Sequence, residues 1–329
     1  MQHCQRFRYL LGGPVGSLTA AYLSSSTRNG SKAICHQQAQ IGTATYPANN
    51  PSEDRYVYHI DTESACKMIA VVDGHGGWQV SEYVSKSLVE TLKKHTIFNI
   101  PFKKESLIDK GMKTVFQDLE NGYLDQVRSA YKLGFGSVAS VGCCLLVALQ
   151  QDKNVVIANC GDCRAVLGNQ SADGGKYIGI TITKDHNCRE IIEQIKLLRE
   201  HPGEENAFVC KPNNTSACYV KGRLQLTRSI GDAYLKYHAF NALEGAHRSA
   251  GRHIPSPYTP PYVSHEPEMH HIELGTNDKF LIIASDGVWD FMSAQEAVEI
   301  VASVSEMDGN KAAALLVQKT IERAAAESG

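Results

Sequence analysis

The apolar positions of this chain include two short uninterrupted runs, and each run ends in an Asp-Gly pair. The first run is Met68–Val72, followed by Asp73-Gly74, and the second is Phe280–Ser285, followed by Asp286-Gly287. Apolar, β-branched runs that are closed by a turn signal predict buried strands. Because glycine allows a sharp turn, we expect each run to place a carboxylate at the end of a buried strand.

Helical periodicity marks the segment after the first run. Trp78–Lys94 carries apolar side chains at three- and four-residue intervals, which predicts an amphipathic helix packed on a core. The apolar face of this helix consists of Val80, Val84, Leu88 and Leu92. Similar patterns predict four more helices, at Leu107–Ala130, Arg189–Glu200, Ala294–Ser303 and Gly309–Glu327.

Alternating or β-branched segments predict the remaining strands. These segments are Ile34–Thr45, Tyr56–Ile60, Val138–Leu149, Asn154–Asn159, His265–Glu273 and Lys279–Ser285. The polar stretch His201–Gly222 predicts a loop or lid, and Tyr237–Pro261 predicts a second long irregular insert. Strands pair as hairpins and helices occur in separate blocks, so we expect an α+β fold and not a parallel doubly wound sheet.

Composition and charge exclude several classes of protein. The chain has 329 residues, of which 43% are hydrophobic, enough for one large domain or two small ones. Its net charge of −2 gives no overall field that would attract nucleic acid or an anionic membrane. No stretch approaches the roughly 18 consecutive apolar residues of a membrane span.

The 10 cysteines mostly stand alone within apolar or mixed segments, so we expect buried free thiols. Cys160 and Cys163 have the C-x-x-C spacing of a redox or zinc site, but no second pair at zinc spacing accompanies them. We expect a structural role for this pair, and a redox-regulated adaptor that uses it is a weaker alternative. Trp78 and Trp289 are expected to be core or helix-staple residues.

The first 33 residues differ in composition from the rest of the chain. No Asp or Glu occurs before Glu53, while arginine and serine are frequent. This composition is typical of an organellar transit segment, and the alternative is a first strand with loops of the domain itself. The compartment therefore stays open between the cytoplasm and the mitochondrial matrix, both intracellular.

Five short motifs follow one another between residues 53 and 290. They are Glu53-Asp54, Asp73-Gly74-His75-Gly76-Gly77, Asn159-Cys160-Gly161-Asp162-Cys163-Arg164, Thr227-Arg228-Ser229-Ile230-Gly231-Asp232 and Ala284-Ser285-Asp286-Gly287-Val288-Trp289-Asp290. Their order and spacing resemble those of the metal-dependent protein phosphatases of type 2C, the PPM class. The resemblance covers residues 34–329 and implies a four-layer α-β-β-α sandwich of two antiparallel sheets flanked by helices. Three further segments, Asn49–Arg55, Lys184–Asn187 and Tyr258–Tyr262, resemble the pyruvate dehydrogenase phosphatase branch.

The resemblance implies a set of metal ligands. Asp73 would bridge two metal ions, and the carbonyl of Gly74 would ligate one of them. Asp286 would ligate the first ion, Glu53 would hold the water on the metals, and Asp54 would support that water shell.

The remaining motif residues receive other implied roles. Asp162 and Asp290 match positions that hold a third, weaker metal in some members. His75 matches the general acid that protonates the leaving alkoxide. Asn49 stands where most of the family carries a phosphate-binding arginine, so it is the candidate phosphate contact, and it carries no charge. For Asp232 we expect a structural role at the base of the lid.

Elementary electrostatics leads to the same chemistry. Two carboxylates about 4 Å apart repel by roughly 4 kcal/mol at an effective dielectric near 20, so a cluster of them needs cations. All-oxygen ligands select hard ions such as Mg²⁺ or Mn²⁺. Two such ions activate a water and hold the phosphoryl oxygens, so no cysteine or serine nucleophile is required. We therefore expect a Ser/Thr phosphatase that acts on phosphorylated proteins, and the sequence leaves its oligomeric state open.

One departure from the family pattern supports a different hypothesis. Members of the family end in a strand that begins with Asp-Asn or Asp-Asp, and its first Asp completes the first metal site. This sequence stops at Gly329, near the expected place of that pair, so we expect the natural chain to continue. The alternative is a pseudophosphatase, a binding module with an incomplete metal site. The absent Asp and Arg favour it, and the presence of Asp73, Asp286, Glu53 and His75 argues against it.

Overall fold

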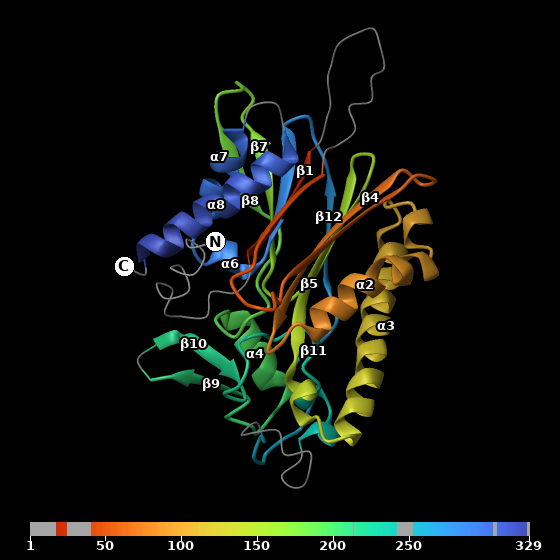
Figure 1. Ribbon diagram of the computed structural model, residues 1–329, viewed down its shortest axis with the longest axis vertical. Coiled ribbons are helices and arrows are strands. Elements are labelled where there is room, and N and C mark those ends of the chain that lie inside the picture. The colour runs from red at the N-terminus through yellow and green to blue at the C-terminus, as the bar shows by residue number, and fades with distance from the viewer. Residues whose placement is uncertain (1–17, 25–40, 213, 242–252, 305–307, 328–329) are drawn as a thin grey trace.

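The strands of the protein form two antiparallel sheets and a separate hairpin (Figure 1). The structure is a computed structural model that describes residues 18–24, 41–212, 214–241, 253–304 and 308–327. The first sheet has the order β2 (Ile41–Tyr46), β1 (Leu18–Ser24), β13 (Asp278–Ala284), β7 (Arg164–Gln170) and β8 (Tyr177–Thr181). The second has the order β12 (Glu268–Glu273), β6 (Asn154–Cys160), β5 (Gly142–Gln151), β4 (Cys66–His75) and β3 (Arg55–Asp61), and β11 (Ile230–Gly231) pairs with one end of β5.

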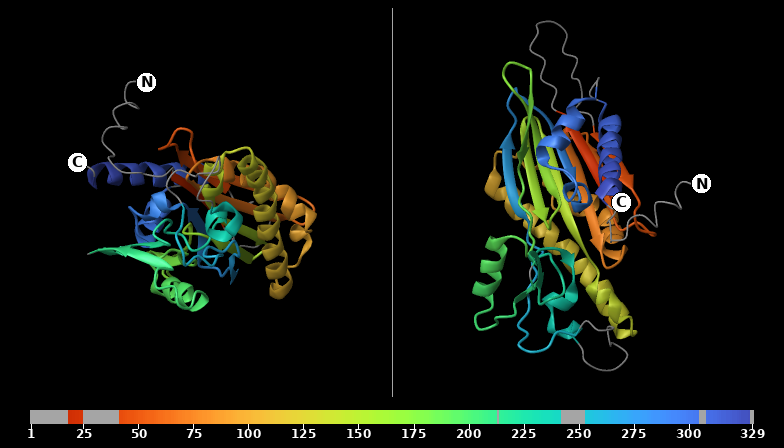
Figure 2. Two further views of the ribbon diagram at one scale, coloured as in Figure 1. Left: turned by 90° about the horizontal axis from the view of Figure 1, so that it is seen from below. Right: turned by 90° about the vertical axis from the view of Figure 1, so that its left-hand side faces the viewer.

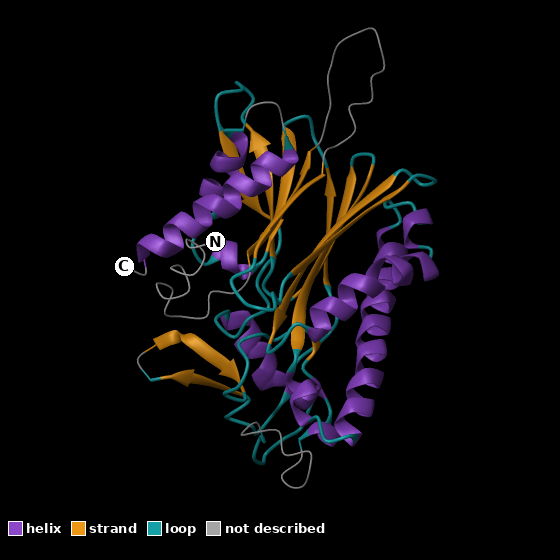
Figure 3. Ribbon diagram, viewed as in Figure 1, coloured by secondary structure: helices purple, strands orange, loops and turns teal. Residues whose placement is uncertain are grey.

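Helices cover the outer faces of both sheets (Figure 3). On the second sheet lie α2 (Gln79–Lys94) and α3 (Glu105–Lys132), and on the first lie α7 (Ala294–Ala302) and α8 (Gly309–Glu327). Figure 2 shows these two pairs on opposite sides of the strands. Shorter helices and 3₁₀ turns connect the layers: α4 (Ile191–Glu200), α5 (Ala233–Lys236), α6 (Asp286–Trp289), Ile97–Asn99, Gly136–Ser140 and His238–Phe240. The predicted α+β class and the α-β-β-α sandwich are confirmed.

Strand β4 shows why its sequence is continuously apolar. Its side chains alternate between two buried layers, because Met68, Ala70 and Val72 face the helices α2 and α3. Ile69 and Val71 face the first sheet and pack in the layer between the sheets. A strand that is buried on both faces has no polar alternation, and its end lies inside the molecule.

The predicted helices are confirmed within a few residues at their ends. All four residues of the predicted apolar face, Val80, Val84, Leu88 and Leu92, are fully buried in α2. The same face of the sandwich receives α3, whose Met112, Phe116 and Leu119 are also fully buried. These helices form where the apolar period of about 3.6 residues meets a sheet.

The segment His201–Gly222 was predicted as a loop or lid, and an irregular loop is wrong for its second half. A hairpin forms there from β9 (Phe208–Lys211) and β10 (Asn214–Val220). Phe208 and Cys210 on β9 point to the core, while Val209 and Lys211 are more exposed, an alternation too short to stand out in the sequence.

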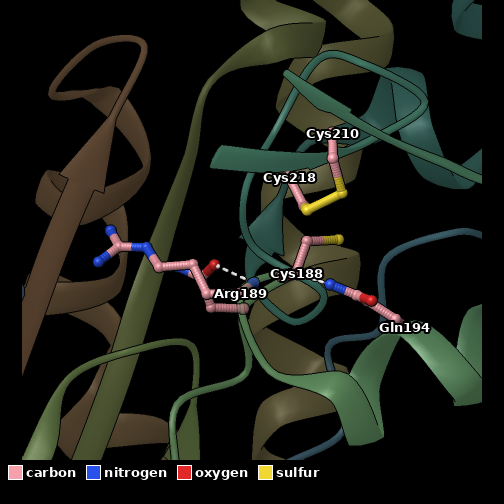
Figure 4. Close-up of a disulfide and its surroundings, with 6 residues drawn as sticks. Cys188, Arg189, Gln194, Cys210 and Cys218 are labelled. Carbon is pink, nitrogen blue, oxygen red and sulfur yellow. Dashed lines mark hydrogen bonds between the residues drawn. A yellow bond between two sulfur atoms is a disulfide. The ribbon is translucent and has the colours of Figure 1, made fainter. Parts of the chain in front are cut away.

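The expectation of free thiols is wrong for two cysteines. A disulfide joins Cys210 to Cys218 across the hairpin, because strand pairing puts the two residues opposite each other (Figure 4). The thiol of Cys188 points toward this disulfide in Figure 4, and burial raises its pKa to about 12. The expectation is confirmed for six buried free cysteines, which include Cys160 and Cys163.

Other predicted features need smaller corrections. The strand predicted over Val138–Leu149 begins only at Gly142, because a 3₁₀ turn occupies Gly136–Ser140. β7 and β8 were not predicted at all. Trp289 is buried as expected, but the Trp78 residue is 39% exposed, since it precedes α2 on the surface.

Two predictions concern the ends of the chain and its relation to membranes. Of the strand predicted over Ile34–Thr45, the described part is β2, and residues 34–40 lie outside the described residues. Residues 18–24 form β1, which pairs with both β2 and β13. Within the described ranges no helix is both long and apolar enough to span a bilayer.

Candidate metal centre and active site

Three aspartates from distant parts of the sequence meet at one end of the sandwich. Asp73 lies near the end of β4, Asp162 lies in the turn between β6 and β7, and Asp286 begins α6 directly after β13. Carboxylate oxygens of the three residues lie within 4.8 Å of one another. β4 and β13 belong to different sheets, so the packing of the two sheets creates the cluster.

Local interactions fix the turn that carries Asp286. Ser285 ends the extended segment, and α6 starts at the next residue. The indole Nε1 of Trp289 donates a hydrogen bond to the carbonyl of Ala284 at 2.9 Å. This bond ties the end of the short helix back to β13 and leaves the Asp286 side chain directed at the cluster.

Asp162 is held by two neighbouring side chains. Asn187 Nδ2 donates to Asp162 Oδ2 at 3.0 Å, and the thiol of Cys144 donates to Oδ1 at 3.2 Å. Gly161 precedes it with φ of +122°, and a Cβ at this position would overlap the Cys144 side chain. The turn therefore requires glycine at position 161.

Asp54 and Glu53 approach the cluster from the segment before β3. Asp54 is buried, and its Oδ2 accepts a hydrogen bond from Ser285 Oγ at 3.1 Å. Glu53 Oε2 accepts a hydrogen bond from Asn49 Nδ2 at 2.9 Å. Gly74 is buried beside them. A Cβ at this position would lie 2.6 Å from the carbonyl oxygen of Glu53, so the close approach leaves no room for a side chain.

Asp290 lies at the outer edge of the site. It follows α6, is exposed, and pairs with Arg189 Nη1 at 3.4 Å. Its charge also acts on Asp286. The structure thus brings all the carboxylates predicted from the sequence to one end of the sandwich.

Electrostatics shows that this cluster is costly without a cation. Burial, followed by the charges of Asp54 and Asp286, raises the pKa of Asp73 well above its ordinary value. Burial also raises the pKa of Asp286 to about 8, with contributions from Asp162 and Asp290. Carboxylates that retain protons near neutral pH would release them to a divalent cation. An all-carboxylate donor set fits Mg²⁺ or Mn²⁺, so the residues present fit the metals that the resemblance implies.

His75 lies beside the carboxylates and has a partner that the sequence did not identify. His75 Nε2 and Asp232 Oδ2 are 2.7 Å apart. Burial lowers the pKa of His75, but the Asp232 carboxylate, with smaller contributions from Asp162 and Glu53, outweighs it, so the pKa lies above its ordinary value. For Asp232 the sequence suggested only a structural role, and no local signal links residues 157 positions apart.

The sequence also did not predict two hydrogen bonds to the site carboxylates. Asn187 was noted only as part of the segment Lys184–Asn187, and its amide binds Asp162. Ser285 was assigned only to the end of a strand, and it binds Asp54. Both lie next to predicted motif residues, so their proximity in sequence was the available signal.

A groove lies outside the carboxylate cluster. It has a volume of about 610 Å³ and lies between α4 and the segment 261–266. Lys196, Lys236, Glu193 and Glu266 are among its lining residues, and none of the cluster carboxylates is. The groove is therefore not the site of the metal chemistry.

Known proteins resemble this chain along most of its length. Residues 35–329 match the family model "Protein phosphatase 2C". The rice (Oryza sativa subsp. japonica) "Probable protein phosphatase 2C 43" is 32% identical over 270 residues, which are 82% of this chain and 65% of that protein. The Arabidopsis thaliana "Probable protein phosphatase 2C 68" is 33% identical over 271 residues, 81% of this chain and 65% of that protein. The chain thus spans about two thirds of the length of these relatives.

Solved structures support the same fold. The serine-threonine phosphatase 2C from Toxoplasma gondii superposes with a TM-score of 0.64 at 19% identity, covering 84% of this chain and 85% of that chain. A C. elegans sex-determining protein superposes with a TM-score of 0.60 at 18% identity, covering 82% of this chain and 58% of that one. At these identities the likeness concerns the fold alone. Together with the family model and the closer sequence relatives, it shows that this chain belongs to the protein phosphatase 2C family.

Proposed function

We propose that this protein is a metal-dependent protein phosphatase that hydrolyses phosphoserine and phosphothreonine in protein substrates. The observation that carries the proposal is the convergence of Asp73, Asp162 and Asp286 within 4.8 Å. Bound Mg²⁺ or Mn²⁺ would neutralise the phosphoryl oxygens and activate a water for attack on phosphorus. The proposed catalytic domain covers residues 34–329, and of the preceding segment the described residues, Leu18–Ser24, contribute β1 to its first sheet.

The carboxylates divide the work of holding the metals. We assign Asp73, the Gly74 carbonyl and Asp286 to two ions. Glu53 and Asp54 would hold the surrounding water. Asp162 and Asp290 would hold a third ion more weakly, since Arg189 pairs with Asp290 and competes for its charge.

Two further residues would act on the substrate. The Asn49 amide lies against Glu53 at 2.9 Å and has a second N–H that can donate to a phosphate oxygen. His75, with its raised pKa, would carry the proton that the leaving alkoxide needs. Asn49 carries no charge, so phosphate binding depends mainly on the metals.

The test is release of phosphate from a phosphothreonine peptide by the purified chain. We expect release with Mn²⁺ or Mg²⁺, none with EDTA, and a loss of at least about 100-fold in Asp286→Asn. Asp125→Asn is the matched control, because the Asp125 side chain is 75% exposed on α3 and pairs with Arg128 at the surface. A folded wild-type chain that releases nothing at millimolar metal would contradict the proposal and support the pseudophosphatase alternative.

A further inference from the structure

The sheet topology places His75 and Asp232 on either side of one glycine. In β5, Gly142 pairs with His75 of β4 on one edge and with Gly231 of β11 on the other. A Cβ at Gly142 would lie 2.5 Å from His75 Nε2 and would overlap Asp232 Oδ2. The absence of a side chain at this position is what lets the imidazole reach the carboxylate across the strand.

The backbone at Asp232 is fixed in an unusual conformation. Asp232 has φ of +51°, in the left-handed region, where Asn and Asp are the best tolerated residues after glycine. Its N–H donates to the carbonyl of Val141 at 2.9 Å. Ser229 Oγ donates to Asp232 Oδ2 at 2.6 Å, the same oxygen that contacts His75. The carboxylate is therefore held in one orientation before any substrate binds.

A buried ion pair supports this turn from below. Lys236 Nζ lies 2.9 Å from Glu120 Oε2 and donates to the carbonyl of Ser229 at 2.8 Å. Glu120 Oε2 also accepts from the N–H of Gly231 at 2.8 Å. Both charged side chains are almost fully buried. Because Lys236 is committed to Glu120, it does not neutralise Asp232.

His75 is therefore the basic partner of the Asp232 carboxylate. Asp232 is 1% exposed, and its oxygens form an ion pair with no other basic group of the described chain. A buried carboxylate is stable only when donors surround it, and here the donors are Ser229 Oγ and His75 Nε2. This requires a proton on Nε2 in both the neutral and the charged imidazole.

We propose that Asp232 is the positioning residue of the phosphatase: it fixes His75 with a proton on Nε2, so that Nδ1 is the atom that protonates the leaving alkoxide. The inference rests on the proposed function for its catalytic part. In the step, the oxygen of the attacking water forms a bond to phosphorus, and one proton of that water passes to the solvent. The P–O bond to the serine or threonine breaks, and its electron pair stays on the serine or threonine oxygen. The Nδ1–H proton moves to this oxygen, the imidazole remains neutral with Nε2–H, and water returns the proton after product release.

The kinetic test compares two substrates in Asp232→Asn. Asparagine suits the left-handed backbone and has the same shape, but its amide can donate to Nε2 and so no longer requires a proton on that nitrogen. A phosphothreonine peptide needs a proton on its leaving group, whereas p-nitrophenyl phosphate releases a stable anion. We expect kcat for the peptide to fall by about 100-fold or more and kcat for p-nitrophenyl phosphate to fall by less than about 5-fold.

Two further variants make the comparison specific. His75→Gln should show the same substrate pattern, and the double variant should lose nothing more, because the two residues act as a unit. Glu204→Gln removes another buried carboxylate, one that pairs with Lys221. This variant should lower kcat for both substrates by the same factor. Equal losses on both substrates in Asp232→Asn, or additive losses in the double variant, would overturn the proposal.

A spectroscopic measurement decides the proton position independently of turnover. In ¹⁵N-histidine-labelled protein, the neutral His75 ring should carry its proton on Nε2, with the signal assigned by its absence in His75→Gln. Asp232→Asn should shift the ring toward the Nδ1–H form. A wild-type ring protonated on Nδ1 would refute the proposal. If the wild-type chain hydrolyses neither substrate, the proposed function fails, while the ring signal still shows whether Asp232 fixes the proton.

Discussion

Removal of one carboxylate from the cluster should stabilise the metal-free protein. Asp286→Asn keeps the shape of the side chain and removes one charge from a group whose oxygens lie within 4.8 Å. One pair of charges at that distance repels by about 3.5 kcal/mol at an effective dielectric of 20. Relaxation and retained protons reduce this figure, so we expect the variant to gain about 1–3 kcal/mol in free energy of unfolding at pH 8.

The pH dependence gives the sign of the effect. The pKa of Asp286 is raised to about 8 in the folded protein, so the folded state holds a proton that the unfolded state releases above its ordinary pKa of 3.8. Stability therefore falls as pH rises toward 8, with a slope of up to about 1.4 kcal/mol per pH unit for one proton. Between pH 6 and 8 the free energy of unfolding of the wild-type chain should fall by about 2 kcal/mol more than that of the variant.

Urea unfolding in EDTA at pH 6 and pH 8, followed by tryptophan fluorescence, measures this difference. Metal should reverse the order: at about 100 times its Kd, Mn²⁺ adds about 2.7 kcal/mol to the wild-type chain and less to the variant. A metal-free variant that is no more stable than wild type at pH 8 would refute the reasoning. It would mean that the folded chain relieves the repulsion without a cation.

Three further substitutions test the packing and the buried charges, each by urea or thermal unfolding. Phe116→Ala should lower the free energy of unfolding by about 3–5 kcal/mol, because this side chain is fully buried on the inner face of α3. A loss below about 1 kcal/mol would contradict the described core. Glu204→Gln should cost about 3–5 kcal/mol by leaving Lys221 buried without its partner. Burial opposes ionisation of Glu204, but its hydrogen bonds and Lys221 bring its pKa to about 2, so this stability is present above pH 4.5 and disappears toward pH 2. Gly161→Ala should lower the Tm by several degrees, because its φ of +122° and the Cys144 side chain leave no space for a Cβ; an unchanged Tm would show that this turn is not rigid.

The sequence alone identified the features that depend on near neighbours. The apolar period of Val80, Val84, Leu88 and Leu92 predicts the buried face of α2, because side chains three or four residues apart share a helix face. The two apolar runs that end in Asp-Gly predict β4 and β13, since turn chemistry is local, although β4 continues through Asp73 and Gly74 to His75. The order of the motifs also indicated the family. These signals single out Asp73 and Asp286, whose carboxylates the structure brings together, as candidate site residues.

Only the tertiary structure decided which distant groups meet. Strand β7 forms because β13 supplies a partner more than a hundred residues later, and β8 then pairs with β7; the alternation of both strands is weak. Cys210 and Cys218 become a disulfide because strand pairing sets them opposite each other. Asp232 reaches His75 across Gly142 only after three strands have paired in register. Periodicity reports the face on which a side chain lies, whereas register and sheet packing determine its contacts, and those depend on the whole fold.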